Sequence, residues 1–208
     1  MKFLIYFDLY MENIKINLTT ISKIISTVIN PFMASSLTFA ILIYFNSTIE
    51  IPHTIFLVSF LFSNILQLIT IFYFIRLGKV FSIDAPIKEQ RIELLAIGAI
   101  YYAIGFILLT YLEAPQIIRG VMFCYALNTA IVWRITIYWK ISIHMVGICG
   151  PIIALWLGGF EYPLTMCITI IIVAISRLIL KAHTLAQVIC GAVLAMSLAY
   201  LELTYLFL

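Results

Sequence analysis

Apolar runs of about 20 residues occupy almost the whole chain, each ended by a charge, a proline, a glycine or an aromatic cluster. A helix of about 20 residues crosses a hydrocarbon layer roughly 30 Å thick. Strands of that length are not expected in membranes outside closed barrels, so run length favours helices. The runs predict seven membrane-spanning helices, over residues 21–45, 54–75, 94–112, 117–137, 142–158, 164–180 and 184–205.

Composition supports this class, because hydrophobic residues make up 64% of the chain and charged residues only 10%, which excludes an ordinary soluble domain. The runs leave no room for an extramembrane domain, and there is no internal repeat, low-complexity tract or linker. We therefore expect one all-α integral-membrane domain over residues 1–208, a polytopic bundle of about seven transmembrane helices.

The N-terminus begins like a secretory signal for a few residues, but Asp8 and Glu12 interrupt it and no small-residue cleavage site follows. We expect a retained cytoplasmic tail. The four cysteines all lie in predicted spans without metal-ligand or redox spacing. We expect them to be small apolar packing residues, at positions Cys124, Cys149, Cys167 and Cys190.

Two short stretches each place a histidine beside phosphate-binding side chains at the end of a predicted helix. Ionisable residues at such positions are costly in a membrane, so they indicate function. The stretches are Lys140-Ile141-Ser142-Ile143-His144, and Ser176-Arg177 followed by His183 and then Gln187.

The predicted topology places both stretches and the loop from Arg76 to Arg91 on one side, because two helices separate each successive pair. By the positive-inside rule that side is cytoplasmic. The net charge of +3 needs no nucleic-acid partner, since cations beside a membrane explain it. Eleven of the twelve basic residues share this side, namely Lys2, Lys15, Lys23, Arg76, Lys79, Lys88, Arg91, Arg134, Lys140, Arg177 and Lys181, and only Arg119 lies opposite.

The order and spacing of these residues resemble the type 2 phosphatidic-acid phosphatase family. Ser176-Arg177, five residues and His183 resemble its third signature, and Ser142-Ile143-His144 resembles the Ser-Gly-His core of its second. The resemblance covers roughly residues 84–191 and is compatible with a six-helix phosphatase-like core. It implies a membrane lipid phosphatase that hydrolyses a lipid phosphate monoester or diphosphate, of the polyprenyl or phosphatidic-acid type, without metal or cofactor.

The resemblance also implies the catalytic roles. His183 would be the nucleophile that forms a phosphohistidine, and His144 would protonate the leaving oxygen and then activate water. Arg177 would neutralise the non-bridging oxygens, since a guanidinium binds them bidentately. Ser142 and Ser176 would add hydroxyl groups, and backbone N–H groups at the start of the fifth span would favour an anion.

Gln187 lies one helical turn beyond His183, which suits a partner that orients the imidazole. The family's more familiar signature has aspartate there. Glutamine can orient the ring through its carbonyl oxygen but brings no negative charge. Two interpretations stay open. The protein belongs to a branch of the family in which a neutral residue orients the histidine, or its activity is reduced.

The first signature of the family, lysine, six residues, arginine and proline, is matched only at Arg91. Asp84 stands in the place of the lysine, and Ile92 follows the arginine. Lys140 or Lys88 could supply the missing charge. Each has a structural alternative, because Lys88 could belong to a soluble loop and Lys140, beside aromatic residues, could be an interfacial anchor.

The remaining polar residues of the spans have structural explanations. His53 lies near the opposite surface. Asn64, Gln67 and Asn128 suit interhelical hydrogen bonds, with a substrate groove as the alternative, and Gly191 with Ala195 suits close helix packing.

Two other functions stay open. A catalytically silent binder or transporter of lipid phosphate would explain the glutamine and the altered first signature. A transporter unrelated to phosphate would need a midplane ionisable site, and none is expected. The sequence leaves the lipid and the oligomeric state undetermined.

Overall fold

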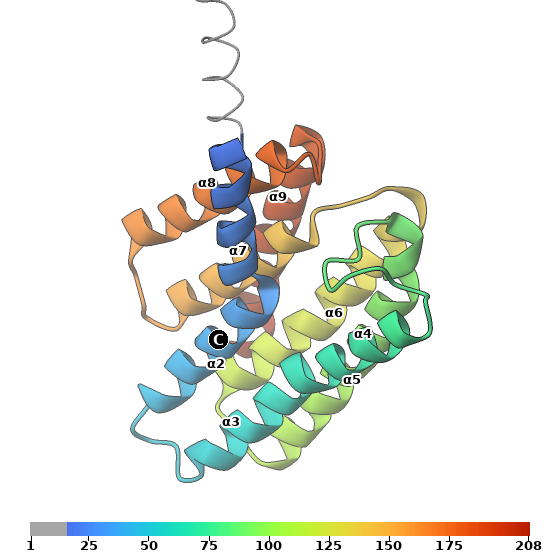
Figure 1. The fold of residues 1–208 in the computed structure, drawn as a ribbon. Coiled ribbons are helices and arrows are strands. Elements are labelled where there is room, and N and C mark those ends of the chain that lie inside the picture. The colour runs from blue at the N-terminus through green and yellow to red at the C-terminus, as the bar shows by residue number, and fades with distance from the viewer. Residues whose placement is uncertain (1–15) are drawn as a thin grey trace, which may run out of the picture.

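The computed structural model describes residues 16–208, which are helical throughout apart from short connections (Figure 1). Each of the seven predicted spans coincides with one helix or with a run of consecutive helices. The elements are α1 (Ile16–Val28), α2 (Pro31–Tyr44), α3 (Pro52–Phe60), η1 (Leu61–Ile65), α4 (Leu66–Arg76), α5 (Lys88–Tyr111), α6 (Gln116–Tyr138), α7 (Ile143–Leu157), α8 (Pro163–Ile179), α9 (Leu185–Glu202) and η2 (Leu203–Phe207).

Four of these helical segments are long and apolar enough to cross a membrane, Pro52–Arg76, Lys88–Tyr111, Gln116–Tyr138 and Leu185–Phe207. The bent pair α1 and α2 makes a fifth if it is one span. The other two apolar helices, α7 and α8, have 15 and 17 residues, at or below the usual length of a transmembrane helix. Residues 16–208 therefore have the architecture of a multi-pass helical membrane protein with four to five spans.

The first predicted span is not one straight helix, because its two parts meet at an angle of 42°. Asn30 has an extended backbone, with φ −111° and ψ 165°, as a residue before proline prefers. Its side chain accepts a hydrogen bond from the Met33 N–H at 2.9 Å, and Pro31 begins α2. The Asn-Pro pair thus ends α1 and redirects the chain, a local signal that run length alone conceals.

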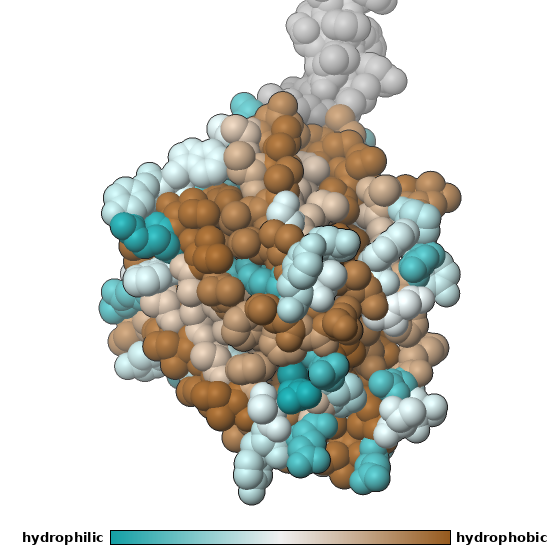
Figure 2. Space-filling view, turned by 180° about the vertical axis from the view of Figure 1, so that it is seen from behind, coloured by the Kyte–Doolittle hydropathy of each residue, from teal (hydrophilic) through white to brown (hydrophobic). Residues whose placement is uncertain are grey.

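Two helical groups are packed around apolar cores. One core joins α2, α3, α5 and α6 around Phe39, Ile43, Leu109 and Met122, and the other joins α7 to α8 and α9. Large apolar side chains point outward, as Leu57 does at 65% exposed, and hydrophobic residues cover most of the face seen in Figure 2. A continuous apolar exterior of this kind fits lipid contact.

Glycine allows α9 to approach the connection between α6 and α7. A Cβ atom on Gly191 would lie 2.9 Å from the carbonyl oxygen of Ser142, too close for an ordinary contact. This confirms the prediction of close helix packing at Gly191. The contact also fixes the start of α7 against the start of α9, where the residues of the two motifs lie.

The other structural predictions have mixed outcomes. The predicted N-terminal tail lies outside the described residues. All four cysteines are free, but only Cys124 and Cys149 are buried, whereas Cys167 and Cys190 are exposed on their helices, so the packing prediction is wrong for those two. His53 is at the surface beside Tyr44, as expected.

One ionisable residue of the last predicted span, Glu202, is buried within the helical bundle. Its side chain is 6% exposed and accepts a hydrogen bond from Asn128 Nδ2 at 3.3 Å. Glu202 is the last residue of α9, and η2 continues the helix beyond it.

Candidate functional site

Three chain connections meet at one end of the helical bundle, residues 77–87, 139–142 and 180–184. Lys140 Nζ donates to the Ala182 carbonyl oxygen at 2.9 Å, and Arg91 Nη1 donates to that of Ile141 at 3.4 Å. The Ser142 N–H donates to the carbonyl oxygen of Gln187 at 3.3 Å. The predicted convergence of the motifs on one end of the bundle is therefore observed.

His183 is held in one tautomer by Gln187. The Gln187 Oε1 atom lies 3.1 Å from the Thr184 N–H, a group that can only donate, so this atom is the amide oxygen. The same oxygen lies 3.2 Å from His183 Nδ1, which must therefore carry the hydrogen. His183 Nε2 is then the unprotonated nitrogen. It is buried and has no hydrogen-bond partner among the described residues.

The local sequence explains why Gln187 is in place. Thr184 is the N-cap of α9, and its hydroxyl accepts from the Gln187 N–H at 3.4 Å while the Gln187 side chain accepts from the Thr184 N–H. This capping box sets the first turn of α9. A glutamine at the third helical position thus satisfies a backbone N–H and orients the imidazole with one oxygen atom.

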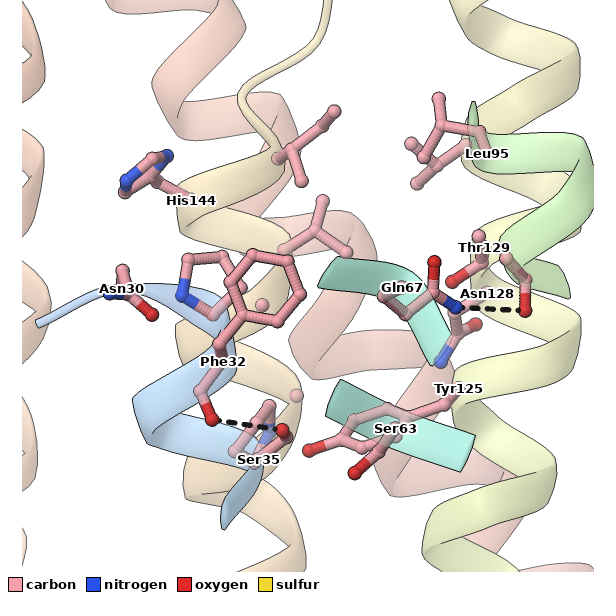
Figure 3. A pocket seen from close by; sticks show the side chains of 18 of the residues that line it. Asn30, Phe32, Ser35, Ser63, Gln67, Leu95, Tyr125, Asn128, Thr129 and His144 are labelled. Atoms are coloured by element: carbon pink, nitrogen blue, oxygen red, sulfur yellow. Dashed lines mark hydrogen bonds between the residues drawn. The ribbon is translucent and has the colours of Figure 1, made fainter. Parts of the chain in front are cut away.

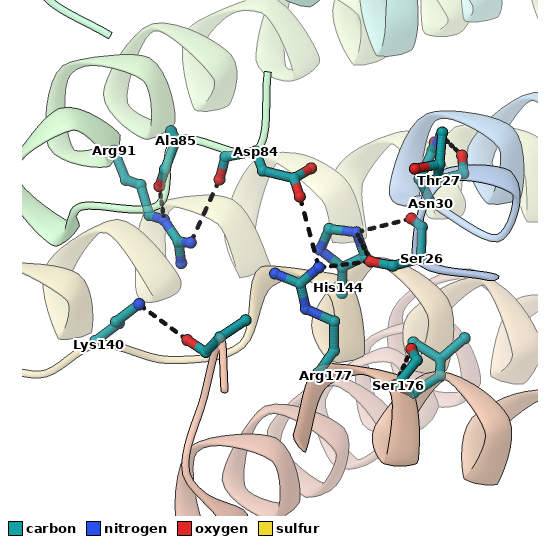
Figure 4. Close-up of polar contacts among 12 residues, drawn as sticks. Ser26, Thr27, Asn30, Asp84, Ala85, Arg91, Lys140, His144, Ser176 and Arg177 are labelled. Atoms are coloured by element: carbon teal, nitrogen blue, oxygen red, sulfur yellow. Dashed lines mark hydrogen bonds and ion pairs between the residues drawn. The ribbon is translucent and has the colours of Figure 1, made fainter. Parts of the chain in front are cut away.

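His144 and Arg177 share a partner on α1, the buried Ser26 (Figure 4). Arg177 Nη1 donates to Ser26 Oγ at 2.5 Å. His144 Nε2 lies 3.3 Å from the same Oγ and 3.2 Å from the Ser26 carbonyl oxygen. Because a carbonyl oxygen only accepts, Nε2 carries the hydrogen and Nδ1 is left to exchange a proton.

The Arg177 guanidinium also faces a carboxylate, since Asp84 Oδ2 lies 3.6 Å from its Nη1 (Figure 4). The Arg177 side chain is 4% exposed, but that of Asp84 is 55% exposed. Arg177 Nε is buried without a partner among the described residues. The guanidinium therefore has a buried donor, Nε, without a partner in the described part of the chain, and a carboxylate neighbour that solvent reaches.

Ser142 is fully buried at the N-cap position of α7, yet its hydroxyl has no hydrogen-bond partner within residues 16–208 and does not cap the helix. The first N–H groups of a helix have no carbonyl partner within it, and the helix dipole adds positive potential there. The start of α7 therefore offers a hydroxyl and backbone donors to an anion.

Arg91 and Lys140 contribute charge beside these groups. Arg91 is 3% exposed and bonds through Nε to the Ala85 carbonyl oxygen at 2.6 Å, which ties residues 77–87 to α5. Burial, together with the charges of Arg91 and Arg177, lowers the pKa of Lys140. Burial is the larger cause, and the repulsion that adds to it shows that Lys140 lies near two other cations.

The pKa of His183 is lowered from 6.5 to about 3, first by burial and then by the positive charges of Arg91 and Arg177. The ring is therefore neutral throughout the physiological pH range. A neutral imidazole whose Nε2 lone pair is not used in a hydrogen bond is the form required of a nucleophile.

Two predicted phosphate-binding residues are not brought into this group. Ser176 Oγ donates to the Val173 carbonyl oxygen at 2.8 Å, so its hydroxyl is used within α8. Lys88 Nζ donates to the Ile137 carbonyl oxygen at 3.0 Å and lies 3.7 Å from Glu89. Lys88 thus satisfies the C-terminal end of α6, a structural role.

Ser26 and Asp84 are residues of the group that sequence reasoning missed as site residues. The signal for Ser26 is a polar stripe of four-residue spacing, Ser22, Ser26 and Asn30, in the first predicted span. Such spacing places polar groups on one helix face. In the sequence Asp84 stands out only as the replacement for a lysine, and its pairing with Arg177 depends on the fold of residues 77–87.

No group of three or more histidine, cysteine, aspartate or glutamate side chains able to hold a metal gathers within residues 16–208. The polar atoms that are free at the site are a histidine nitrogen, a hydroxyl and guanidinium donors, a set suited to an oxyanion. Comparison of the chain with protein-family models, with curated proteins and with solved structures finds no match.

Proposed function

We propose that this protein is a membrane lipid phosphatase of the type 2 phosphatidic-acid phosphatase kind, which hydrolyses a lipid phosphate monoester or diphosphate through a phosphohistidine. The observation that supports this most strongly is the state of His183. Gln187 fixes the hydrogen on Nδ1, and Nε2 is buried, unprotonated and unpartnered beside cationic side chains. Nearly all buried polar groups in proteins are hydrogen-bonded, so a buried ring nitrogen without a partner points to a role in binding or chemistry.

In the first step His183 Nε2 attacks phosphorus, and the bond from phosphorus to the leaving oxygen breaks. Protonated His144 gives its Nδ1 proton to that oxygen, which departs as a lipid alcohol, or as a lipid monophosphate from a diphosphate. In the second step His144 Nδ1 takes a proton from water, and the resulting hydroxide attacks phosphorus. The phosphorus–nitrogen bond breaks, releasing inorganic phosphate and restoring neutral His183.

The charges of the site suit this reaction. Arg177 Nε and the Ser142 hydroxyl are unpartnered donors, and the N–H groups at the start of α7 add to them. Arg177, Arg91 and Lys140 are three cations against the one carboxylate of Asp84, so a phosphate dianion would neutralise the site. Electrostatic stabilisation of non-bridging oxygens is the main catalytic requirement of phosphoryl transfer.

A lipid suits the remainder of the site. A cavity of about 790 Å³ is lined by Asp84, Arg91 and His144 and extends between the helices as far as Ala199 and Leu203. If a phosphate head group bound at the end of the cavity near Arg91, the hydrocarbon chain of the lipid would lie in the rest of the cavity. In the membrane we propose seven passes, with α7 and α8 crossing as short helices and the site on the cytoplasmic side.

A second function is favoured by two observations. Asp84 pairs with Arg177 where the resembled family has a lysine, and Gln187 brings no negative charge to His183. A lipid-phosphate binder without turnover would keep the cations and could tolerate both changes.

Phosphate release from purified protein separates the two. The protein in detergent is given phosphatidic acid, a polyprenyl phosphate and a polyprenyl diphosphate, each with and without EDTA. We expect release that EDTA leaves unchanged and that His183→Ala abolishes. His53→Ala is the matched control, because His53 lies outside the site, bonded to Tyr44. Binding of these lipids with no release would favour the silent binder.

A further inference from the structure

The inward face of α1 is polar, unlike the apolar cores that hold the other helices together. Ser22 and Ser26 are the only buried residues of α1, at 3% and 4% exposed, and large apolar side chains point outward, as Ile24 does at 57% exposed. A buried hydroxyl group is costly unless it is hydrogen-bonded. The hydrogen bonds on this face therefore define what α1 contributes to the protein.

The end of α1 leaves the Ser26 carbonyl oxygen without a partner in its own helix. The last regular hydrogen bond of α1 runs from the Ile29 N–H to the Ile25 carbonyl oxygen at 2.8 Å. The next would join the Asn30 N–H to the Ser26 carbonyl oxygen, but the chain turns at Asn30, because a residue before proline avoids the helical conformation. His144 Nε2 lies 3.2 Å from this oxygen instead, and Figure 3 shows Asn30 and His144 on the wall of the cavity. The helix break therefore supplies the acceptor that fixes the His144 tautomer.

The Ser26 hydroxyl holds a second group, the Arg177 guanidinium. Arg177 Nη1 donates to Ser26 Oγ at 2.5 Å and also lies 3.6 Å from Asp84 Oδ2 (Figure 4). The two acceptors differ in burial, because the Asp84 side chain is 55% exposed whereas Ser26 is 4% exposed. A bound phosphate could displace the solvent-exposed carboxylate but not the buried hydroxyl. Ser26 would then be the fixed acceptor that keeps Arg177 in place.

We propose that Ser26 is a positioning residue of the phosphatase reaction. Its carbonyl oxygen orients the general acid–base His144, and its hydroxyl holds the phosphate-binding Arg177. This inference rests on the proposed function, because it gives Ser26 a part in the same reaction. Ser26 acts through these two side chains and neither exchanges a proton nor contacts the reacting phosphorus. The site is therefore completed by α1, and it forms only when that helix is packed against α7 and α8.

Ser26→Ala removes the hydroxyl and keeps the carbonyl oxygen. A hydrogen bond to a charged group contributes a factor of about 10 to 150. We expect kcat/KM for phosphatidic acid or farnesyl phosphate, whichever is hydrolysed faster, to fall by a factor in this range. Because the carbonyl oxygen still orients His144, the pH dependence of kcat should be unchanged. Ser26→Thr, which keeps a hydroxyl at this position, should recover most of the lost activity.

Ser22→Ala is the matched control, because Ser22 is equally buried one turn earlier on the same face of α1. The hydrogen bonds of His144 and Arg177 to α1 go to Ser26 and not to Ser22. We expect Ser22→Ala to lower Tm in detergent about as much as Ser26→Ala does and to leave kcat/KM unchanged. An equal loss of kcat/KM in the two variants would show that the serines only stabilise α1, and it would overturn the inference.

A double-mutant cycle identifies the side chain through which the hydroxyl acts. Ser26→Ala is made both in the wild-type protein and in Arg177→Lys, whose ammonium group keeps the charge but not the planar guanidinium. If the hydroxyl positions the guanidinium, Ser26→Ala should reduce kcat/KM by a much smaller factor in Arg177→Lys than in the wild type. Equal factors in the two proteins would contradict the role of Ser26.

Binding of inorganic phosphate separates this inference from the proposed function. The stabilisation of the purified protein by phosphate against thermal unfolding gives a Kd that requires no turnover. If no lipid is hydrolysed, the proposed function fails, but a Kd that rises in Ser26→Ala and not in Ser22→Ala would still support the positioning of Arg177. A Kd that is unchanged in Ser26→Ala would refute the inference whether or not a lipid is hydrolysed.

Discussion

Replacing Gln187 with leucine tests whether its carbonyl oxygen holds the nucleophile in the reactive tautomer. The change removes the 3.2 Å hydrogen bond to His183 Nδ1 and the 3.1 Å hydrogen bond from the Thr184 N–H. A neutral hydrogen bond contributes about 0.5–1.5 kcal/mol, which is a factor of about 2 to 12. We expect kcat/KM for the best lipid phosphate to fall by at least this factor, because Nδ1 no longer has a fixed acceptor and Nε2 can then carry the hydrogen.

The same substitution weakens the capping box, so stability must be separated from activity. Thr184→Ala removes the hydroxyl that accepts from the Gln187 N–H but keeps the contact between Gln187 and His183. Loss of an N-cap side chain costs about 0.5–2 kcal/mol of stability. We expect both variants to lower Tm in detergent, and only Gln187→Leu to lower kcat/KM. Full activity in Gln187→Leu, or an equal loss in Thr184→Ala, would refute the orienting role.

Three further predictions concern charge, protonation and space. Asp84→Asn removes the carboxylate that competes with phosphate for Arg177. We therefore expect inorganic phosphate to inhibit lipid hydrolysis at a lower concentration. An unchanged inhibition constant would show that Asp84 does not compete with phosphate. Because the pKa of His183 is lowered to about 3, its ¹⁵N resonance in histidine-labelled protein should stay that of a neutral ring from pH 7.5 to 5, and a midpoint near 6.5 would contradict this. Below pH 6.5 His183 binds a proton in the unfolded chain but stays neutral in the folded protein. His183 therefore lowers the free energy of unfolding as the pH falls from 6.5 toward 3. Gly150 lines the cavity, and a Cβ atom on it would meet no atom within 4 Å. We therefore expect the Gly150→Phe side chain to fill the cavity, which should reduce lipid turnover but leave hydrolysis of soluble p-nitrophenyl phosphate intact. Equal losses of both activities would argue against a lipid chain in this cavity.

The positions of the helices follow from the sequence because an apolar run must form all its backbone hydrogen bonds within itself. The number of helices that fully span the membrane does not follow from the sequence in the same way. A run of apolar residues gives no sign of a local break such as Asn30-Pro31. The π-helical turns at Leu61–Ile65 and Leu203–Phe207 are also unpredicted. Apolar runs carry no signal of a changed hydrogen-bond period.

The spacing of His183 and Gln187 predicts their contact, because both belong to one helical turn and local geometry decides it. The proximity of the two motifs follows from counting helices between them. The contacts of Ser26 with Arg177 and His144 could not be predicted in this way. They join α1 to residues more than 110 positions later, and they depend on the bend and packing of α1.

Ser176 and Lys88 are residues whose predicted role in phosphate binding does not match the contacts that their side chains make. Both have side chains suited to phosphate, but a helix backbone offers a closer partner to each, the Val173 carbonyl oxygen for Ser176 and the Ile137 carbonyl oxygen for Lys88. Residue type and spacing show what a side chain can bind. Which of the available partners it binds depends on the backbone nearby.

The most direct test of the central claim is to trap the covalent intermediate. Purified protein is mixed with a lipid phosphate that it hydrolyses, quenched in alkali, in which phosphohistidine survives, and mapped by mass spectrometry. We expect an acid-labile phosphate on His183 that forms in the His53→Ala control and is absent from His183→Ala. Phosphate release without any modification of His183, or with the phosphate on another residue, would contradict it.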